Sequence, residues 1–379
     1  MKNLFYIGII GIILFEILKV YFIMPMPGSQ EIHSIDVAYF LHSWRWMFRV
    51  VLGGLALAGI LWAYRSQRWV TLLFVAICLL VAWQFNFKLA ADNMFLPPAE
   101  LVMVDHIENK IPSEKLVLGI HHNGEARAYP IQLIAYHHQV LDSLEGNPIM
   151  VTYCSVCRSG RVFEPNVNGS PESFRLVGMD QFNAMFEDKT TQTWWRQASG
   201  EAIAGPLKGS ILPELPSQQT TLKQWLTLYP NSKVMQPDSA FIKEYSDLDD
   251  YDFGIERGDL TRTDTLSWQN KSWVVGLELA SSSKAIDWNL LKEKRILNLT
   301  LADTPIVLAL ASDNQSFFAF ERPSDKSFTL VNDSLVVENI KYNLLGYSTA
   351  ANVTPLKPVK AYQEFWHSWR TFHPDAEKK

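Results

Sequence analysis

Apolar residues gather near the amino end of the chain in three long runs, at residues 4–22, 46–64 and 69–85. Each run approaches the ~20 residues that a helix needs to cross a bilayer. We therefore predict three transmembrane helices within residues 1–91. A cleaved signal peptide fits the first run poorly, because residues 24–28 offer no small-x-small cleavage site and two more runs follow.

Basic residues predict the orientation of these helices. Arg65 and Arg68 lie in the short connector between the second and third runs, and the positive-inside rule places that connector in the cytoplasm. Three crossings then put everything after Lys88 outside the cytoplasm. We expect a multi-pass protein of the inner cell membrane, with extracytoplasmic C-terminal domains and the lipid bilayer as a partner. Glu16 and Lys19 are spaced to pair on one helix face.

Beyond residue 91 the hydrophobic pattern shortens. Residues 92–115 are typical of a linker, and the chain then alternates short β-branched or aromatic runs with turn residues. The dipeptide Asn123-Gly124 between two such runs predicts a tight β-hairpin. Strands are predicted at residues 117–121, 126–129, 149–153, 161–163, 174–177 and 193–197, and helices at residues 131–141, 221–228 and 361–372. The predicted fold class is α+β, dominated by sheet.

The part beyond the linker repeats itself. Residues 118–120 (Leu-Gly-Ile) match residues 275–277 (Val-Gly-Leu), and Phe163-Glu164 matches Phe320-Glu321, at one offset of 157 residues. We predict two related modules, a first at residues 116–238 and a second at residues 271–379. Between them, residues 239–270 form an acidic linker. Its most acidic part, residues 246–259, lacks the Gly and Glu positions of a calcium loop, so we expect it to be solvated.

Charge and composition narrow the class of function. The formal net charge is −5 and no basic cluster with interleaved aromatic residues occurs, so nucleic acid is not an expected partner. The chain has only three cysteines, which excludes a scaffold held by many disulfides. Cys78 lies in an apolar run. Cys154 and Cys157 form a CxxC motif, a spacing that can close a small disulfide ring or share one soft metal ion.

Three interpretations of the CxxC pair are open. In the first, the protein is a thiol-dependent oxidoreductase that needs no cofactor and exchanges with a thiol-bearing protein. Cys154 then attacks as a thiolate and Cys157 resolves the mixed disulfide, while Arg158, Arg161 and His138 favour the charged sulfur. In the second, Cys154, Cys157 and His138 bind or deliver zinc or copper. In the third, a structural disulfide between the two cysteines tightens a non-catalytic interaction module.

The repeat locates this chemistry in the first module. At the same offset, the equivalents of Cys154 and Cys157 are Ala311 and Asn314. Residues shared by both modules are expected to serve the fold, whereas chemistry confined to one module leaves residues that the other lacks. We therefore predict a thiol site in the first module and a degenerate, structural role for the second.

Several motifs resemble those of a known family. Thr152-Tyr153-Cys154 with Cys157, then residues 183–188 (Asn-Ala-Met-Phe-Glu-Asp), 195–197 (Trp-Arg-Gln) and 200–207 (Gly-Glu-Ala-Ile-Ala-Gly-Pro-Leu), are similar to the bacterial domain of unknown function 3179 family. The resemblance covers residues 116–238, with a weaker second copy beyond. Some members of that family are described as possible selenoproteins, which implies that a chalcogen at the cysteine motif does redox work.

The resemblance also implies particular site residues. The aromatic-cysteine motif of the family falls on Tyr153, Cys154 and Cys157, and its usual His-Glu pair falls on His138 and Gln139. If that glutamate serves as a general base in the family, this chain lacks it. Arg158 replaces a usual glycine. Four further residues match family positions and are implied to line the same cleft: Asn183, Trp195, Gln197 and Glu201.

Overall fold

The computed structural model describes residues 1–379, and the chain divides into two compact units. Unit 1 comprises Met1–Leu96 and Asn166–Leu212, and unit 2 comprises Pro97–Pro165 and Pro213–Lys379. The predicted domain boundaries do not follow this division, because residues 166–212 leave the first predicted module and fold with the N-terminal helices. The fold class is mixed α+β, with several small sheets.

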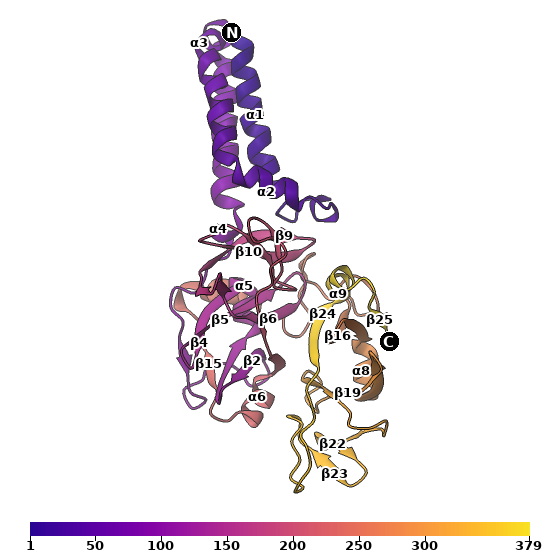
Figure 1. Ribbon diagram of the computed structural model, residues 1–379. Coiled ribbons are helices and arrows are strands. Elements are labelled where there is room, and N and C mark those ends of the chain that lie inside the picture. Colours follow the sequence, from indigo (N-terminus) through magenta and orange to yellow (C-terminus); the bar gives the residue numbers. More distant parts are fainter. The chain divides into compact units, whose positions relative to one another are not determined.

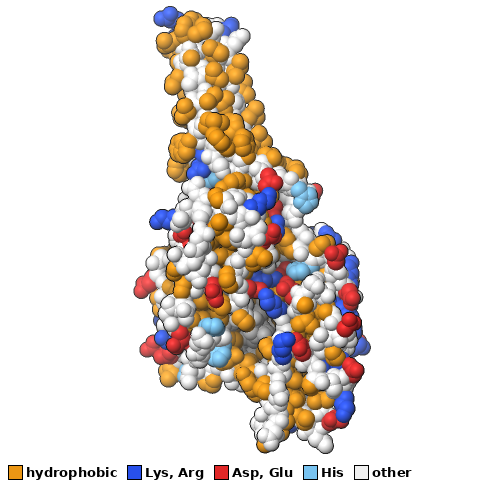
Figure 2. All heavy atoms as spheres, in the orientation of Figure 1, with side chains coloured by type: hydrophobic (Ala, Val, Ile, Leu, Met, Phe, Trp, Pro, Cys, Tyr) orange, Lys and Arg blue, Asp and Glu red, His pale blue; other side chains and the backbone are white.

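Unit 1 begins with long apolar helices (Figure 1). These are α1 (Lys2–Tyr21) and α3 (Arg45–Trp83); a 3₁₀ turn (Ser29–Glu31) and α2 (Ile35–Ser43) lie between them, and a π-helical turn (Gln84–Lys88) and α4 (Ala91–Met94) follow. By length and composition, Lys2–Tyr21 and Arg45–Lys88 are apolar enough to cross a membrane. Many of their large apolar side chains are exposed, and Figure 2 shows hydrophobic side chains covering these helices.

Helix α3 is interrupted at Gln67, whose φ of −149° and ψ of 72° are not helical. Both parts of α3 contact α1. Before Gln67, the backbone of Ala56 lies so close to Gly8 that a Cβ there would be 2.4 Å from the Ala56 nitrogen. After Gln67, Phe74 stacks edge-on against Tyr6 with ring centroids 5.6 Å apart. The interruption coincides with the predicted basic connector, but three separate spans stay a prediction, since the structure has two long apolar helices.

A buried polar cluster joins these helices. Glu16 accepts hydrogen bonds from Arg49 Nε (2.6 Å) and Asn86 Nδ2 (2.8 Å), and Lys19 Nζ lies 3.1 Å from its carboxylate. The predicted pairing of Glu16 with Lys19 is therefore confirmed.

Residues 166–212 add a small antiparallel sheet to unit 1. Its strands follow the order β12 (Ala202–Ala204), β11 (Trp194–Arg196), β10 (Asn183–Asp188) and β9 (Phe174–Asp180), and a short hairpin of β7 (Asn166–Val167) and β8 (Ser170–Pro171) precedes them. Strand β9 touches the chain that leaves α1: Met179 N–H donates to the carbonyl of Ile23 (2.8 Å). The neighbouring Gly178 has φ of 154°, and a Cβ there would lie 2.2 Å from the same carbonyl, so only glycine fits.

Unit 2 contains a first segment of strand, strand, helix and three further strands. These are β2 (Leu116–His122), β3 (Glu125–Pro130), α5 (Ile131–His137), β4 (Gln139–Leu144), β5 (Asn147–Cys154) and β6 (Ser159–Phe163); the chain re-enters the unit with β13 (Glu214–Leu215), β14 (Ser217–Thr221), α6 (Leu222–Leu228) and β15 (Lys233–Met235). With β1 (Met103–Val104), the strands form two sheets, β1-β15-β3-β2-β14 and β13-β6-β5-β4.

A second segment of unit 2 begins with the same order of strand, strand, helix and three strands, and it also ends with strand, helix and strand. It comprises β16 (Trp273–Leu279), β17 (Ser282–Asp287), α8 (Trp288–Lys294), β18 (Ile296–Leu301), β19 (Thr304–Leu310), β20 (Phe317–Glu321), β21 (Thr329–Val331), β22 (Ser334–Val337), β23 (Ile340–Tyr342), β24 (Lys360–Phe365), α9 (Trp366–Phe372) and β25 (Glu377–Lys378). Its sheets are β24-β16-β17-β25, β18-β19-β20 and β21-β22-β23. A 3₁₀ turn (Ser239–Phe241) and α7 (Ile242–Ser246) lie between the segments.

Equivalent contacts occur in both segments. Gly119 of β2 lies under the ring of Trp225, and Gly276 of β16 lies under the ring of Trp369; a Cβ at either glycine would be within 2.4 Å of the ring. The last strand of each segment pairs in parallel with the second strand of its hairpin, β15 with β3 and β25 with β17. Apolar side chains from both hairpin strands, α8 and β18 to β20 form the core of the second segment.

Two predicted helices are shorter than expected. The helix predicted at residues 131–141 ends at His137, and residues 139–141 open β4. The helix predicted at residues 361–372 begins only at Trp366, because residues 360–365 are strand β24 and pair with β16 along its whole length. Pairing with a distant strand outweighs the local helical pattern there. The predicted linker at residues 92–115 contains α4 and β1.

Candidate functional site

Cys154 and Cys157 lie at the turn that joins β5 to β6. Cys154 is the last residue of β5 and pairs with Ser159, the first residue of β6. The N–H of Cys157 donates to the carbonyl of Cys154 (3.2 Å), the hydrogen bond of a β-turn. The two cysteines therefore share one tight turn.

This turn is covered by protein on all sides. Cys154 is 1% exposed, Cys157 0% and Arg158 1%, and Ser155 and Val156 are buried as well. The structure contains no disulfide bond, so the disulfide predicted between Cys154 and Cys157 is not present. Because thiol exchange requires contact with a second sulfur, the cover of this turn has to open before a substrate reaches either thiol.

His138 connects α5 to the strand that carries Cys154. It follows the last residue of α5 with φ of 60°, and its carbonyl accepts a hydrogen bond from Tyr153 N–H (2.9 Å). Its Nδ1 lies 2.8 Å from the carbonyl of Tyr153 and therefore carries the proton, which leaves Nε2 as an acceptor. Complete burial lowers the pKa of His138 to about 4, so the imidazole is neutral at physiological pH.

Arg158 places a buried cation next to Cys157. Its φ of 56° is a left-handed conformation, which explains why glycine suits this position. The guanidinium donates to Gln363 Oε1 (3.0 Å) and to the carbonyls of Tyr251 (2.9 Å) and Asp252 (2.8 Å), and it lies over the ring of Trp273, 3.8 Å from the centroid. None of these acceptors is a carboxylate, so Arg158 forms no ion pair.

Part of the acidic linker folds against the turn. Tyr251 and Asp252 are both 0% exposed, so the prediction of a solvated connector is wrong for these residues. Tyr251 Oη donates to the carbonyl of Ser155 (2.7 Å), and Asp252 Oδ2 accepts from Leu116 N–H (2.9 Å). Burial raises the pKa of Asp252 to about 6, although the Leu116 hydrogen bond and the charge of Arg158 oppose the shift. The aromatic residues within this acidic stretch were the feature of the sequence that could have indicated its burial.

The ring of Tyr153 completes this side of the site. Tyr153 is 0% exposed and packs edge-on against Tyr251, with ring centroids 6.1 Å apart. Burial raises the pKa of the Tyr153 phenol, and the charge of Arg158 opposes that shift. The phenol therefore stays protonated at physiological pH and is no source of negative charge beside the thiols.

Lys271 is the residue that sequence reasoning missed. Its Nζ donates to the carbonyls of Val156 (2.7 Å) and Leu260 (2.5 Å) and lies 3.2 Å from His367 Nε2. Burial lowers the pKa of Lys271 to about 8, while negative charge on Cys157, Cys154 and Asp264 opposes the shift. Lys271 forms no ion pair with a carboxylate. It stands far from the motif in the sequence, where no local pattern points to it.

The second segment of unit 2 thus helps to build the site. Besides Lys271, Phe365 N–H donates to the carbonyl of Cys157 (2.9 Å), and His367 Nε2 lies 3.1 Å from the carbonyl of Val156. Burial lowers the pKa of His367 to about 3, so this imidazole is neutral. A purely structural role for the second segment, as predicted, understates its part, because its residues cover the CxxC turn directly.

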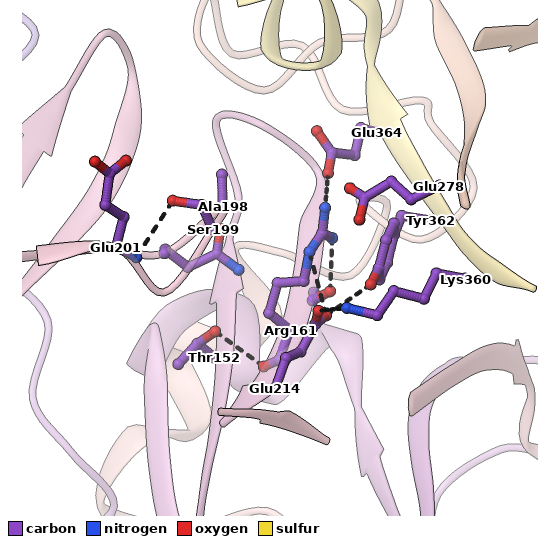
Figure 3. A network of polar contacts seen from close by, with 12 residues as sticks. Thr152, Arg161, Ala198, Ser199, Glu201, Glu214, Glu278, Lys360, Tyr362 and Glu364 are labelled. Carbon is purple, nitrogen blue, oxygen red and sulfur yellow. Dashed lines mark hydrogen bonds and ion pairs between the residues drawn. The ribbon is translucent and has the colours of Figure 1, made fainter. Parts of the chain in front are cut away.

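Arg161 lies at the centre of a polar network between β6 and β24 (Figure 3). Its guanidinium donates to Glu364 Oε1 (2.5 Å), lies 3.6 Å from Glu214 Oε1, and stacks over the ring of Tyr362, 3.4 Å from the centroid. Both Arg161 and Glu364 are 1% exposed. The charge of Arg161 is therefore balanced by carboxylates, and its role is to hold the second segment against the first. Thr152 Oγ1 donates to its carbonyl (2.9 Å).

The metal interpretation gains no support from the geometry. No three His, Cys, Asp or Glu side chains are grouped so that they could hold a metal ion. In the predicted set of Cys154, Cys157 and His138, the Nδ1 of His138 is already used by the carbonyl of Tyr153, which would leave only Nε2 for a metal.

The remaining cleft candidates belong to unit 1, where each has a structural partner. Asn183 Nδ2 donates to Gln197 Oε1 (3.0 Å), Trp195 Nε1 donates to Asp188 Oδ2 (2.9 Å), and the carboxylate of Glu201 lies 3.1 Å from Arg196. Asn183, Gln197 and Trp195 are buried, whereas Glu201 is partly exposed. These contacts tie the strands of the small sheet together, and the family motifs around them thereby serve the fold of unit 1.

Comparison with known proteins identifies one family. A family model described as a protein of unknown function (DUF3179) matches residues 97–376. No curated protein matches the chain, and no solved structure does.

Proposed function

The chain belongs to the DUF3179 family, and from the buried CxxC turn we propose that Cys154 and Cys157 form a redox-active dithiol. The proposed activity is thiol–disulfide exchange. The observation that carries the proposal is the combination of two thiols in one tight turn with two buried cations, Arg158 and Lys271, neither of which has a carboxylate in an ion pair.

The proposed reaction has two steps. The Cys154 thiolate attacks one sulfur of a substrate disulfide, which breaks that bond, forms a mixed disulfide and expels one thiolate. Cys157 then attacks the sulfur of Cys154, which closes the Cys154–Cys157 disulfide and releases the second substrate thiolate. The two cysteines together lose two electrons and two protons to the substrate, and a thiol-bearing partner returns the dithiol to its reduced form by the reverse exchange.

The cations supply the electrostatic support. Both cations favour a thiolate over a neutral thiol in the same pocket, although the charges of Asp252 and Asp264 also act on Arg158 and Lys271 respectively. Lys271 holds the carbonyl of Val156 inside the turn, and Arg158 directly follows Cys157. His138, a neutral imidazole held by the carbonyl of Tyr153, is the proposed proton acceptor in place of the glutamate that this chain lacks.

A test of the exchange activity uses the full chain purified in detergent. We expect Cys157→Ser to accumulate mixed disulfides through Cys154, and Cys154→Ser to accumulate none. The dithiol should equilibrate with glutathione buffers at a potential between about −120 and about −270 mV. A potential below about −300 mV, together with no trapped partner, would show a structural pair and would end the redox proposal.

Metal analysis of the same preparation tests the alternative of metal binding or delivery. Stoichiometric zinc or copper that is lost equally in Cys154→Ser, Cys157→Ser and His138→Ala would replace the dithiol proposal by a metal site. Under the dithiol proposal, chelator treatment should leave the number of titratable thiols unchanged.

We also propose that the apolar helices anchor the protein in a membrane with three crossings. Support comes from their exposed apolar side chains, from the interruption of α3 at Gln67 and from the basic residues Arg65 and Arg68 beside it. This orientation puts the cysteine turn outside the cytoplasm. A periplasm-dependent reporter fused after Lys379 should then be active and one inserted at Gln67 silent; the opposite pattern would reverse the orientation.

We further propose that the two segments of unit 2 are copies of one module. The order of elements shared at the start and end of both segments, the paired glycine–tryptophan contacts and the parallel closing strands support this relation.

A further inference from the structure

A cavity of about 560 Å³ lies in unit 1 where the apolar helices end. This volume falls within the range of small-ligand sites. The end of α1, the start of α3, the residues after α3, and strands β9 and β10 all contribute to its wall. Its cationic lining residues are Lys19, Arg45, Arg49, Arg175 and Lys189.

The cavity carries an excess of positive charge. Lys19 and Arg49 share the carboxylate of Glu16, and Arg175 lies 2.7 Å from Glu187 and 3.0 Å from Asp92. Three carboxylates therefore face five cations.

Two of the cations, Arg45 and Lys189, form no ion pair. Arg45 donates to the backbone carbonyl of His42 (2.6 Å), and Lys189 extends from the exposed turn after β10. Arg45 is also the first residue of α3, whose N-terminus no side chain caps, so the helix adds positive potential there. An anion in the cavity would meet both uncompensated cations.

Neighbouring groups do not supply the missing negative charge. His42 Nε2 lies 3.2 Å from Glu187, and burial lowers the pKa of His42, so this side chain is neutral at physiological pH. Burial also acts on Glu187, but the His42 hydrogen bond and the charge of Arg175 outweigh it and hold the pKa of Glu187 at about 2. Glu187 is thus fully charged already and is committed to Arg175.

Apolar side chains also line the cavity, which lies at the level expected for lipid headgroups. Val20, Ile23, Phe85 and Leu89 line the cavity beside the cations. At the same ends of the helices, the large aromatic side chains of Trp44, Trp46 and Trp83 are 49%, 66% and 47% exposed. Tryptophan gathers at the interface between hydrocarbon and water, where phosphate groups also lie.

We propose that this cavity binds the headgroup of an anionic phospholipid, with Arg45 and Lys189 contacting the phosphodiester. The acyl chains then lie along the apolar faces of α1 and α3. A bound lipid of this kind would fix the start of α3 and the β9–β10 sheet to the bilayer surface. The inference rests on the proposed membrane anchor and is independent of the dithiol chemistry.

The experiment uses the full chain reconstituted in nanodiscs and compares phosphatidylglycerol with phosphatidylcholine. After extraction into detergent, native mass spectrometry should show phosphatidylglycerol retained on the protein and phosphatidylcholine lost. We expect Arg45→Gln and Lys189→Gln each to weaken the retention of phosphatidylglycerol about fivefold, and the double variant to weaken it further. Lys189 is exposed and unpaired, so Lys189→Gln preserves the fold.

Two controls make the result decisive. Lys208→Gln removes an exposed lysine of unit 1 that pairs with Asp36, and it should not change lipid retention. Inorganic phosphate at millimolar concentration should not displace the lipid; displacement would show a soluble-phosphate site and overturn the lipid assignment. Equal retention of both lipids, or equal loss in Lys208→Gln and Lys189→Gln, would also overturn it. Failure of the protein to enter nanodiscs would refute the membrane anchor itself.

Discussion

The two segments of unit 2 each contain a turn that is closed by the same hydrogen bond, but the residues that surround the two turns differ. In the first segment, Cys157 N–H donates to the carbonyl of Cys154 (3.2 Å); in the second, Asn314 N–H donates to the carbonyl of Ala311 (3.0 Å). The residues that precede β4 and β18 both have a positive φ, 60° at His138 and 65° at Arg295. Both turns therefore close with the same hydrogen bond, although the positive φ within the turn falls on Arg158 (56°) in the first and on Asn314 (61°) in the second.

Their surroundings differ. Every residue from Cys154 to Arg158 is buried, whereas Ser312 and Asn314 of the second turn are exposed. Each turn contacts the strand–helix junction of the other segment: Phe365 N–H donates to the carbonyl of Cys157 (2.9 Å), and Thr221 N–H donates to Ser316 Oγ (3.0 Å). The linker and Lys271 cover only the first turn. The two turns are closed alike, and the additional cover over the first turn makes it the candidate site.

The largest effect is expected when the ion pair between Arg161 and Glu364, which joins the two segments, is removed. Arg161→Met leaves Glu364 as a buried carboxylate without its cation, and we expect the free energy of unfolding to fall by about 4 kcal/mol. Thermal and urea unfolding of the full chain in detergent measure the change. The double variant Arg161→Met/Glu364→Met should recover most of the loss. Lys326→Met, which breaks an exposed pair with Glu338, should change stability by less than about 1 kcal/mol.

The next effect concerns the linker that covers only the first turn. The pKa of Asp252 is about 6 in the folded protein and ~3.9 in an unfolded chain, so the folded state binds more protons between these values. Stability contributed by Asp252 is therefore present at low pH and lost as the pH rises through about 6, by about 3 kcal/mol in total. Asp252→Asn should be more stable than wild type at pH 7.5, and this advantage should shrink at pH 5.

The comparison of unfolding midpoints at the two pH values measures this effect. Asp250→Asn, in the exposed part of the same linker, is the matched control and should follow wild type at both. An Asp252→Asn variant that loses stability at pH 7.5 would show that its charged form is needed.

A smaller effect is expected when Lys271, the cation that the sequence pattern did not indicate, is removed. Lys271→Met takes an ammonium group away from the two thiols, so their pKa should rise by about one unit and alkylation at pH 7 should slow about tenfold. Lys271→Arg should keep most of the rate. Lys294→Met, on an exposed helix end of the second segment, should not alter it. Equal rates in Lys271→Met and Lys294→Met would remove Lys271 from the site.

The smallest effect is expected from moving the motif to the second turn. In a Cys154→Ser/Cys157→Ser background, Ala311→Cys/Asn314→Cys/Arg295→Met creates a CxxC pair in a turn that is closed by the same hydrogen bond but lacks Arg158 and Lys271. Arg295→Met is included because the Arg295 guanidinium donates to Asn314 Oδ1 and to the carbonyl of Ala311. The pH profile of alkylation at the exposed position 314 should have a midpoint near ~8.5, the value of an ordinary thiol. Adding Lys271→Met should leave that midpoint unchanged. A strongly lowered midpoint would mean that the turn itself activates the thiol.

Local patterns predicted much of the fold because they depend on near neighbours. The apolar helices, the hairpin at Asn123-Gly124 and the CxxC motif were all readable from residue type and spacing. Where strand pairing joins distant residues, the local pattern was wrong: residues 361–365 look helical, yet they form β24 because β16 offers a partner along its whole length.

The sequence by itself determined which residues carry reactive chemistry and where the chain turns. Only the tertiary structure decided the environment of that chemistry. In the folded chain Tyr251 and Asp252 are buried, and Arg161 forms an ion pair with Glu364. Lys271 lies near the thiols although it is more than a hundred residues away from them in the sequence. The physical reason is that burial and charge balance depend on which distant surfaces pack together. A periodic pattern of apolar residues shows that one face of an element is buried, but it does not show which part of the chain covers that face.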